Sequence, residues 1–118
     1  MQESNRIELK RELTDSLEKE VIAFLNYREG GVIYIGIDDK TQATVGVKEA
    51  DAIQLQIKDR IKSNISPSTM GLFDVIVEPL DNKKIIKITV ASGSEKPYYL
   101  AKLGMSTKGC FIRIGSAS

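Results

Sequence analysis

Histidine is absent from the 118 residues of this chain, and cysteine occurs once, at Cys110. Without histidine the chain cannot use Ser-His-Asp or Cys-His catalysis, and it cannot bind a metal through imidazole. A single cysteine excludes an internal disulfide and leaves too few ligands for a structural zinc site. Any catalysis must therefore depend on carboxylates, lysines, hydroxyl groups or a metal ion held by carboxylates.

Tryptophan is also absent, and no apolar run approaches the roughly 18 residues that a membrane-spanning helix needs. The N-terminal stretch is highly charged, unlike the apolar core of a secretory signal peptide. The composition is that of a globular protein, with 42% hydrophobic and 28% charged residues. We therefore expect one domain over residues 1–118, a cytoplasmic location and no membrane partner.

Positive charge is scarce in the first part of the chain and concentrated in the last part. Residues 1–82 carry 10 basic and 15 acidic side chains, a balance of −5, whereas residues 83–118 carry 7 basic and 1 acidic, a balance of +6. Such clustering is typical of a surface that binds phosphate groups. The alternative is an ordinary solvated surface on which charges cluster by chance.

The rest of the chain is organised around a helix, a glycine turn and an apolar strand in residues 22–39. Gly30 and Gly31 fit the positive φ of a helix C-cap, and the run from Val32 to Ile37 fits a central strand covered on both faces. Gly36 interrupts that run, which indicates that another segment packs closely against it. The glycines follow a helix and lack the lysine of a nucleotide P-loop, so they do not predict one.

The remaining patterns predict two helices and about six strands. A stripe of Leu17, Val21, Phe24 and Leu25 predicts a helix over 15–28, opened by a capping box of Asp15 and Glu18. A second helix is expected over 49–64, and Asp81-Asn82-Lys83 is typical of a hairpin turn. The expected strands are 7–10, 32–37, 72–79, 85–90 and 111–114. Residues 45–47 are expected as a short strand or an extended return, and 98–100 as a short extended piece. This order predicts an α+β fold, a two-layer sandwich of a mixed sheet and two helices.

Carboxylates at two strand ends form the first candidate site. Glu3 and Glu8 belong to the first strand region, and Asp38 and Asp39 end the central strand, so neighbouring strands would bring them together near Lys10. Oxygen ligands of this kind suit Mg²⁺ or Mn²⁺ and the hydrolysis of phosphodiesters. The alternative is that these acids are ordinary exposed residues at the ends of strands.

Basic residues and tyrosines near the C-terminus form the second candidate site. Lysines and arginine can follow a nucleic-acid backbone while tyrosines stack on bases, and Tyr98 and Tyr99 are spaced among the basic side chains. The alternative is that both tyrosines are half-buried packing residues. The basic residues of this segment are Lys96, Lys102, Lys108 and Arg113.

Three stretches together resemble a known family. They are Glu3-x-x-x-x-Glu8-Leu9-Lys10, then Ala23-Phe24-Leu25-Asn26 with 30–39 and Val45-Gly46, and finally Lys96-Pro97-Tyr98-Tyr99 with 109–116. This set is similar to the schlafen/Alba-like family of DNA-binding domains, also known as divergent AAA domains. The resemblance implies an N-terminal domain of a longer bacterial or archaeal protein, a transcriptional regulator or a RecG-like helicase-related protein. In the animal members, two glutamates and an aspartate are implicated in metal-dependent RNA cleavage, and Glu3, Glu8 and Asp38 or Asp39 match them.

We therefore carry three hypotheses. The first is a nucleic-acid-binding module for DNA or RNA, with contacts from Lys10, Lys84, Lys87, Lys96, Tyr98, Lys102, Lys108 and Arg113. The second is a metal-dependent endoribonuclease with catalytic Glu3, Glu8, Asp38 or Asp39 and a Mg²⁺ or Mn²⁺ ion on Glu3, Glu8 and Asp38. The third is a dimerisation or protein-interaction module, a homodimer for example, because exposed strand edges pair with other chains.

Overall fold

The computed structural model describes residues 2–104, which form two helices and six strands. The predicted α+β class is confirmed, and the predicted strand 111–114 lies outside the described residues. None of the described helices is long and apolar enough to cross a membrane. The elements in chain order are β1 (Ile7–Lys10), α1 (Leu17–Leu25), β2 (Gly31–Ile35), α2 (Ala50–Asn64), β3 (Ile65–Ser66), β4 (Phe73–Leu80), β5 (Lys83–Val90) and β6 (Tyr99–Leu100).

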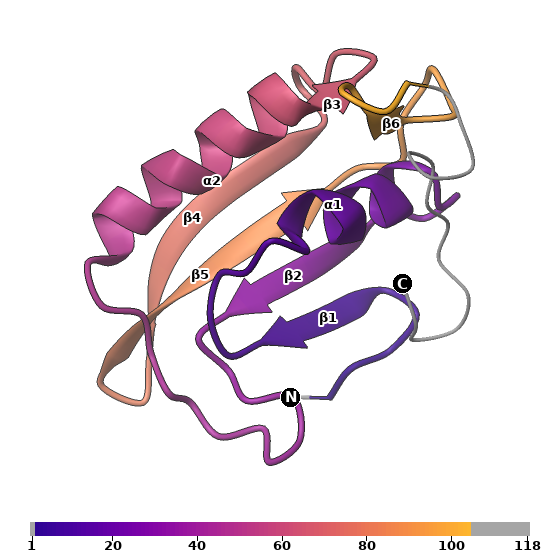
Figure 1. Cartoon of the computed structure of the whole chain (residues 1–118). Coiled ribbons are helices and arrows are strands. Elements are labelled where there is room, and N and C mark those ends of the chain that lie inside the picture. The colour runs from indigo at the N-terminus through magenta and orange to yellow at the C-terminus, as the bar shows by residue number, and fades with distance from the viewer. Residues whose placement is uncertain (1, 105–118) are drawn as a thin grey trace.

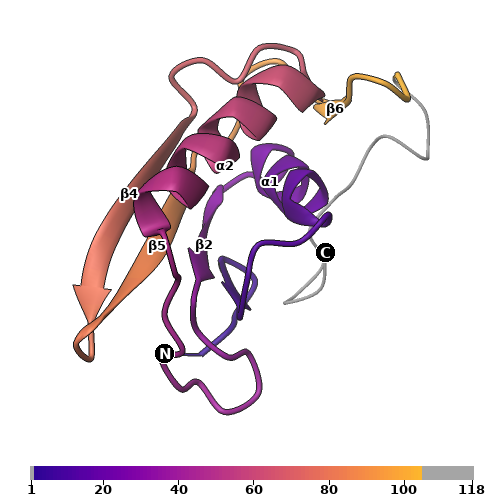
Figure 2. The same ribbon diagram turned by 60° about the vertical axis from the view of Figure 1, so that its left-hand side comes forward.

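The described strands divide between a mixed sheet of four strands, in the order β1-β2-β5-β4, and a small sheet of β3 and β6. In the larger sheet β1 runs parallel to β2, and the other neighbours are antiparallel. Both helices lie on the same face of this sheet, α1 over β2 and β5 and α2 over β4 and β5 (Figure 1 and Figure 2). This arrangement is the predicted two-layer sandwich.

The main core lies between the sheet and the two helices. Ile33 and Ile35 of β2 join Ile86 and Ile88 of β5 in one buried cluster, against which Ile57 of α2 packs. Val32 and Tyr34 point to the other face of β2 and are half-buried. The run from Val32 to Ile35 is therefore central in the sheet as predicted, but the described helices cover one face of it.

Helix α1 is shorter than predicted at both ends. It begins after Ser16, which makes no side-chain capping bond, so the predicted capping box of Asp15 and Glu18 is not formed. Glu18 instead accepts a hydrogen bond from Arg60 of α2. The helix ends at Leu25, and Gly30, at φ 65°, serves a separate turn in which its N–H donates to Tyr27 O. Gly31 is needed for space, since a Cβ there would lie 2.1 Å from the ring of Phe24.

The end of α1 is fastened to a segment far along the chain. The Asn26 Oδ1 accepts from the Tyr98 N–H at 2.7 Å, and the Asn26 Nδ2 donates to the Tyr98 O at 3.1 Å. Next to this pair, the Gly93 N–H donates to Leu25 O at 2.8 Å. The Tyr98 ring is fully buried and packs against Gly93, where a Cβ would lie only 2.0 Å from it.

The segment after β2 turns back across the sheet end. Gly36, at φ 106°, has its O bonded by the N–H groups of Val45 and Gly46, and a Cβ on it would meet Val47 at 3.0 Å. The predicted close approach at Gly36 is therefore confirmed. Of the two predictions for 45–47, a short strand or an extended return, the structure shows the return, because these residues bond to Gly36 and, from Val47, to Lys84 O without forming a ladder.

Both outer strands of the four-stranded sheet have outward backbone groups capped from within the chain. On β1 the Leu9 N–H donates to Glu3 Oε2 at 3.2 Å. On β4 the alternation of the ladder turns Val75 outward. Its N–H donates to Asp74 Oδ1 at 3.0 Å, and its O accepts from Gln54 Nε2 at 2.8 Å. Pro79, two pairs further along, has no N–H to offer.

Replacing Asn26 with alanine should lower the free energy of unfolding by about 1–3 kcal/mol, because it leaves the backbone N–H and O of buried Tyr98 without partners. Urea denaturation followed by circular dichroism would measure this. The matched control is Asn5→Ala, which removes an exposed bond to the Tyr27 hydroxyl and should cost less. An equal or smaller loss for Asn26→Ala would contradict the stabilising role of this pair.

Candidate functional site

The two predicted glutamates lie on different sides of β1. Glu3 lies along the outer edge, where its carboxylate accepts the Leu9 N–H. Glu8 points to the face of the sheet that α1 covers, and it is 7% exposed. The register places Glu8 beside Ile33 of β2, whereas Glu3 bonds to the backbone of the next residue, Leu9, at the outer edge of β1.

Asp38 is used by the turn that follows β2. Its Oδ1 accepts the N–H groups of Lys40 and Thr41, each at 2.9 Å, and its Oδ2 accepts from Arg11 Nη1 at 2.7 Å. The Thr41 amide, the Arg11 guanidinium and the Lys40 amide together hold the pKa of Asp38 well below its usual range. Asp39 is exposed beside it. The carboxylate of Asp38 is thus ionised and its oxygens already have donors.

These acids do not fit a shared metal ion. Within residues 2–104, no group of three or more aspartate, glutamate or cysteine side chains is gathered so that it could hold one. Glu3 bonds to backbone, Asp38 bonds to Arg11 and two amides, and Glu8 lies near a lysine. The predicted set of Glu3, Glu8 and Asp38 therefore provides no common point for Mg²⁺ or Mn²⁺ in this arrangement.

Lys10 lies between two buried carboxylates. Its Nζ is 3.2 Å from Glu20 Oε1 of α1 and 3.8 Å from Glu8 Oε2. Glu20 is 5% exposed and was not among the predicted site residues. The charge of Lys10 is shared with Glu8 and Glu20 in the described structure, and a contact of Lys10 with nucleic acid stays a prediction.

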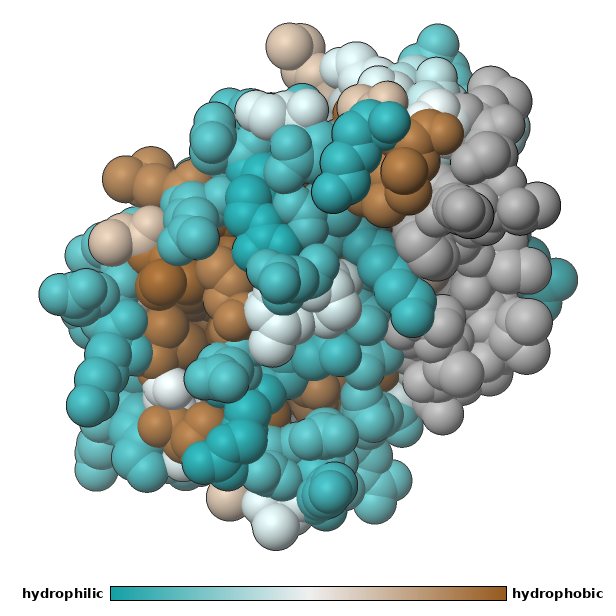
Figure 3. Space-filling view, viewed as in Figure 1, coloured by the Kyte–Doolittle hydropathy of each residue, from teal (hydrophilic) through white to brown (hydrophobic). Residues whose placement is uncertain are grey.

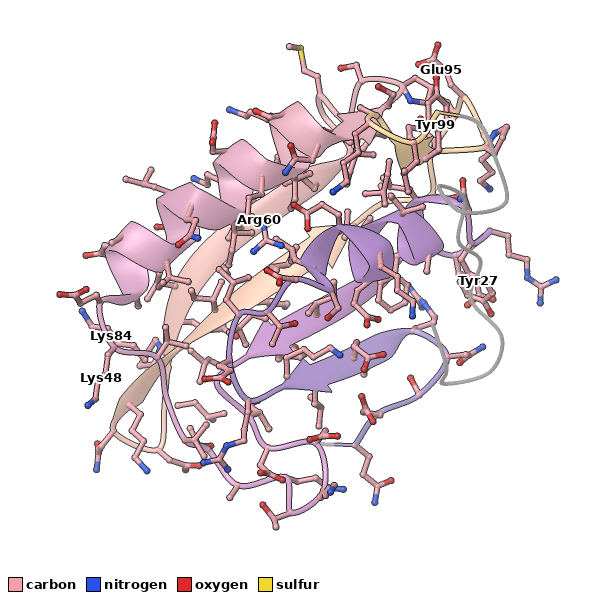
Figure 4. All side chains as sticks on the ribbon, viewed as in Figure 1. Tyr27, Lys48, Arg60, Lys84, Glu95 and Tyr99 are labelled. Carbon is pink, nitrogen blue, oxygen red and sulfur yellow. The ribbon has the colours of Figure 1, made fainter. Side chains whose placement is uncertain are left out.

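The predicted basic residues do not gather on one face of the described structure. Lys84 lies beside Lys48 at the hairpin end of the sheet, far from Glu95 and Tyr99 (Figure 4). Lys87 points to the opposite face of β5 from Lys84. The exposed Lys96 and Lys102 flank β6, and Lys108 and Arg113 lie outside the described residues.

Tyr98 cannot stack on a base. Its side chain is 0% exposed, and the Tyr98 hydroxyl accepts the Glu95 N–H at 3.2 Å. The prediction that Tyr98 contacts nucleic acid is therefore wrong, and the alternative of a packing role holds for it. Tyr99, the next residue, is half-buried in β6.

A polar groove of about 780 Å³ lies between α1, α2 and the residues after β6. Its basic side chains are Lys19 of α1, Arg60 of α2 and Lys102, which follows β6 on the far wall. Figure 4 shows Arg60 between the two helices. The surface seen in Figure 3 is mostly hydrophilic where α1 and α2 meet. The lining residues are Asp15, Glu18, Lys19, Gln56, Arg60, Ser63, Asn64, Leu100, Ala101 and Lys102.

The floor of this polar groove is an ion pair that joins the two helices. Glu18 Oε2 accepts from Arg60 Nε at 2.9 Å and from Asn64 Nδ2 at 2.8 Å, and Glu18 Oε1 accepts from Arg60 Nη2. Arg60 also donates to Thr14 O at 3.1 Å. Burial raises the pKa of Glu18, but the hydrogen bonds from Arg60 and Asn64 outweigh it and leave the pKa below its ordinary value of 4.5. Glu18 is therefore ionised and neutralised in the groove.

Sequence reasoning missed Glu18, Glu20 and Arg60 as site residues, although one signal was present. Glu18 lies three residues before Val21, and Glu20 lies three residues after Leu17. Both glutamates therefore lie inside the apolar stripe of α1. An acid within such a stripe is buried and needs a partner. The sequence gives no comparable signal for Arg60, because an arginine at this position of α2 fits a solvent-exposed residue equally well.

The Schlafen AlbA_2 family model matches residues 3–118. The chain belongs to this family. Among solved structures, it is similar to the N-terminal domain of a RecG-related protein from Nitrosomonas europaea, with 26% identity and a TM-score of 0.71. That match covers 100% of this chain and 84% of the other.

A second similar structure is the DIP2311 protein from Corynebacterium diphtheriae, with 21% identity and a TM-score of 0.61. The match covers 83% of this chain and only 20% of that protein, so the Schlafen AlbA_2 chain spans a small part of its length. No curated protein matches the chain. The family resemblance predicted from the three sequence stretches is confirmed.

The lowered pKa of Glu18 predicts a pH-dependent stability. Its contribution is fully present above the unfolded value near 4.5 and is lost as the pH falls through the lower folded value. Wild-type stability, measured by urea denaturation between pH 7 and pH 3, should therefore fall more steeply with acid than that of Glu18→Gln. The exposed Glu12→Gln variant should keep the wild-type profile, and parallel profiles for all three proteins would contradict the role of Glu18.

Proposed function

We propose that this Schlafen AlbA_2 domain binds nucleic acid, DNA or RNA, through the polar groove between α1 and α2. The observation that carries the proposal is the groove itself, a concave surface of about 780 Å³ lined by side chains that suit phosphate and sugar groups. This volume is within the range of about 300–1,000 Å³ usual for ligand sites. Membership of the family and the similarity to a RecG-related N-terminal domain support the same function.

The charges of the groove favour an anion once the Glu18 pair is taken into account. Glu18 is neutralised by Arg60, and Asp15 is the remaining acid among the described lining residues, against Lys19 and Lys102. Gln56 and Ser63 add uncharged donors from the same side of α2 as Arg60. In our proposal Lys102 contacts the phosphate backbone, and Gln56 and Ser63 bond to the sugar or the bases.

The proposal narrows the predicted contact residues. Lys102 is retained in the groove, and the exposed Lys96, which precedes β6 in the chain, is kept as a further phosphate contact outside the groove lining. Lys108 and Arg113 stay predicted contacts in the part of the chain beyond the described residues. Lys84 and Lys87 are left out, because Lys84 lies away from Arg60 in Figure 4 and Lys87 points to the face of β5 opposite to Ile86 and Ile88, which pack under the helices.

The other two hypotheses receive less support. The endoribonuclease needs Glu3, Glu8 and Asp38 at one point, and their present partners hold them apart. Dimerisation by strand pairing needs free sheet edges, and the described outer strands have capped groups at Leu9 and Val75. Nucleic-acid binding requires no such rearrangement.

Lys102→Ala should weaken binding of a labelled DNA duplex and a labelled RNA hairpin, measured by fluorescence anisotropy between about 50 and 200 mM salt. If Lys102 neutralises one phosphate, the slope of log K against log salt should become shallower by about 1.

The control for this experiment is Lys40→Ala, an exposed lysine in the turn after β2 with the same loss of charge. It should leave the affinity and the slope nearly unchanged. Failure of the wild-type chain to bind either probe at low salt would overturn the proposed function. Equal effects of the two variants would remove the groove as the binding surface.

A further inference from the structure

A second pocket, of about 440 Å³, lies between the last two turns of α2 and the turn over 68–71 that leads into β4. It lies beside Lys58 and Lys62, whereas the polar groove is lined by Gln56, Arg60 and Ser63 of the same helix. The two sites thus use different sides of α2. We propose that this second pocket binds a nucleotide, with its phosphate on the lysines and its nucleoside on the apolar wall.

The phosphate end of the pocket is formed by two adjacent cations. Lys58 and Lys62 are four residues apart on α2 and therefore lie on the same side of the helix, one turn apart. Neither makes an ion pair with any residue between 2 and 104. Asp74 also lines the pocket, but its Oδ1 accepts the Val75 N–H. Two unpaired ammonium groups against one bonded carboxylate favour an anionic ligand.

The turn over 68–71 offers further donors. Thr69 is 2% exposed and lines the pocket, and its hydroxyl is the one buried side-chain polar atom without a hydrogen-bond partner in the described part of the chain. Gly71, at φ 78°, has open space on the side where a Cβ would stand, so a ligand can approach its backbone. A buried hydroxyl without an acceptor is an uncommon feature, and a phosphate oxygen would supply that acceptor once a shift of the turn over 68–71 uncovers the Thr69 hydroxyl.

The rest of the pocket is apolar, which points to more than a bare phosphate. Phe73 and Val75 of β4 line it, and Met70 at its rim is 87% exposed. A methionine this exposed beside an aromatic ring is a suitable surface for a flat base or a sugar. The combination of two lysines, free donors and an apolar wall matches the chemistry of a phosphorylated nucleoside.

The nucleotide can come from two sources, a free mononucleotide or one unit of a nucleic-acid strand bound to the domain. In the second case this inference rests on the proposed function, because the strand that occupies the groove would have to extend around α2 to reach the second pocket. The two sources share the contacts with the lysines, the turn and the apolar wall, and they differ in whether a mononucleotide alone can bind.

The test uses the ¹⁵N-labelled chain and follows the amide signal of Gly71 during titration with AMP, inorganic phosphate and a short single-stranded oligonucleotide. AMP or the oligonucleotide should shift the Gly71 signal, and phosphate alone should bind more weakly. Binding of AMP indicates a mononucleotide site, and a shift by the oligonucleotide alone indicates a unit of a strand. Equal affinity for phosphate and AMP, or stronger competition by a poly-glutamate peptide, would overturn the nucleotide assignment.

Two variants of the pocket and one control make the assignment specific to this pocket. Lys58→Ala combined with Lys62→Ala should weaken AMP or oligonucleotide binding at the Gly71 signal by about tenfold or more. Lys40→Ala combined with Lys48→Ala removes the same charge from exposed lysines elsewhere and should change it little. Thr69→Val keeps both charge and volume, and it should also weaken binding if the hydroxyl contacts the ligand.

The outcomes separate this inference from the proposed function. A wild-type chain that binds the oligonucleotide without moving the Gly71 signal would keep the groove and overturn the second pocket. A chain that shifts Gly71 with AMP but binds neither duplex nor hairpin would keep the second pocket and overturn the groove. Equal losses for the two double-lysine variants would show general electrostatic attraction and overturn the pocket assignment.

Discussion

The pair of hydrogen bonds between Asn26 and the backbone of Tyr98 joins segments 72 residues apart in sequence. It ends α1, buries the Tyr98 ring against Gly93 and places β6 beside β3. Because β6 ends at Leu100 and leads directly into Ala101 and Lys102, the same pair also sets the far wall of the polar groove. The shape of the candidate site thus depends on two backbone bonds of a buried tyrosine.

The two helices are held by a different kind of interaction. An acid buried between helices is costly unless its hydrogen-bonding capacity is filled, and Arg60 and Asn64 fill that of Glu18. The result is a groove floor that is polar yet nearly neutral. Cations on the groove walls can then act on a ligand without competition from this carboxylate.

Local signals in the sequence were sufficient for most of the fold. Asp81 and Asn82 both adopt positive φ in the hairpin between β4 and β5, as their residue types favour, and the isoleucines of α2 define its buried face. The candidate site was harder to predict from the sequence, because its residues are paired by contacts between distant segments. The sequence around Glu18 fitted a local capping box, but the residue that Glu18 bonds to, Arg60, lies 42 residues away. For Tyr98, which follows Lys96-Pro97, the sequence left a packing role and a nucleic-acid contact both open, and it did not distinguish the fully buried Tyr98 from the half-buried Tyr99.

The capped groups on β1 and β4 affect how this domain can be combined with other proteins. Where Glu3 bonds to Leu9 and where Asp74 and Gln54 bond to Val75, the described sheet edges offer no free backbone group to a strand from another chain. Copies of the domain can then stand close together, in tandem or crowded along one ligand, without merging their sheets. Contacts with a neighbouring molecule would then involve helices, turns and side chains, whose sequence can change without altering the sheet.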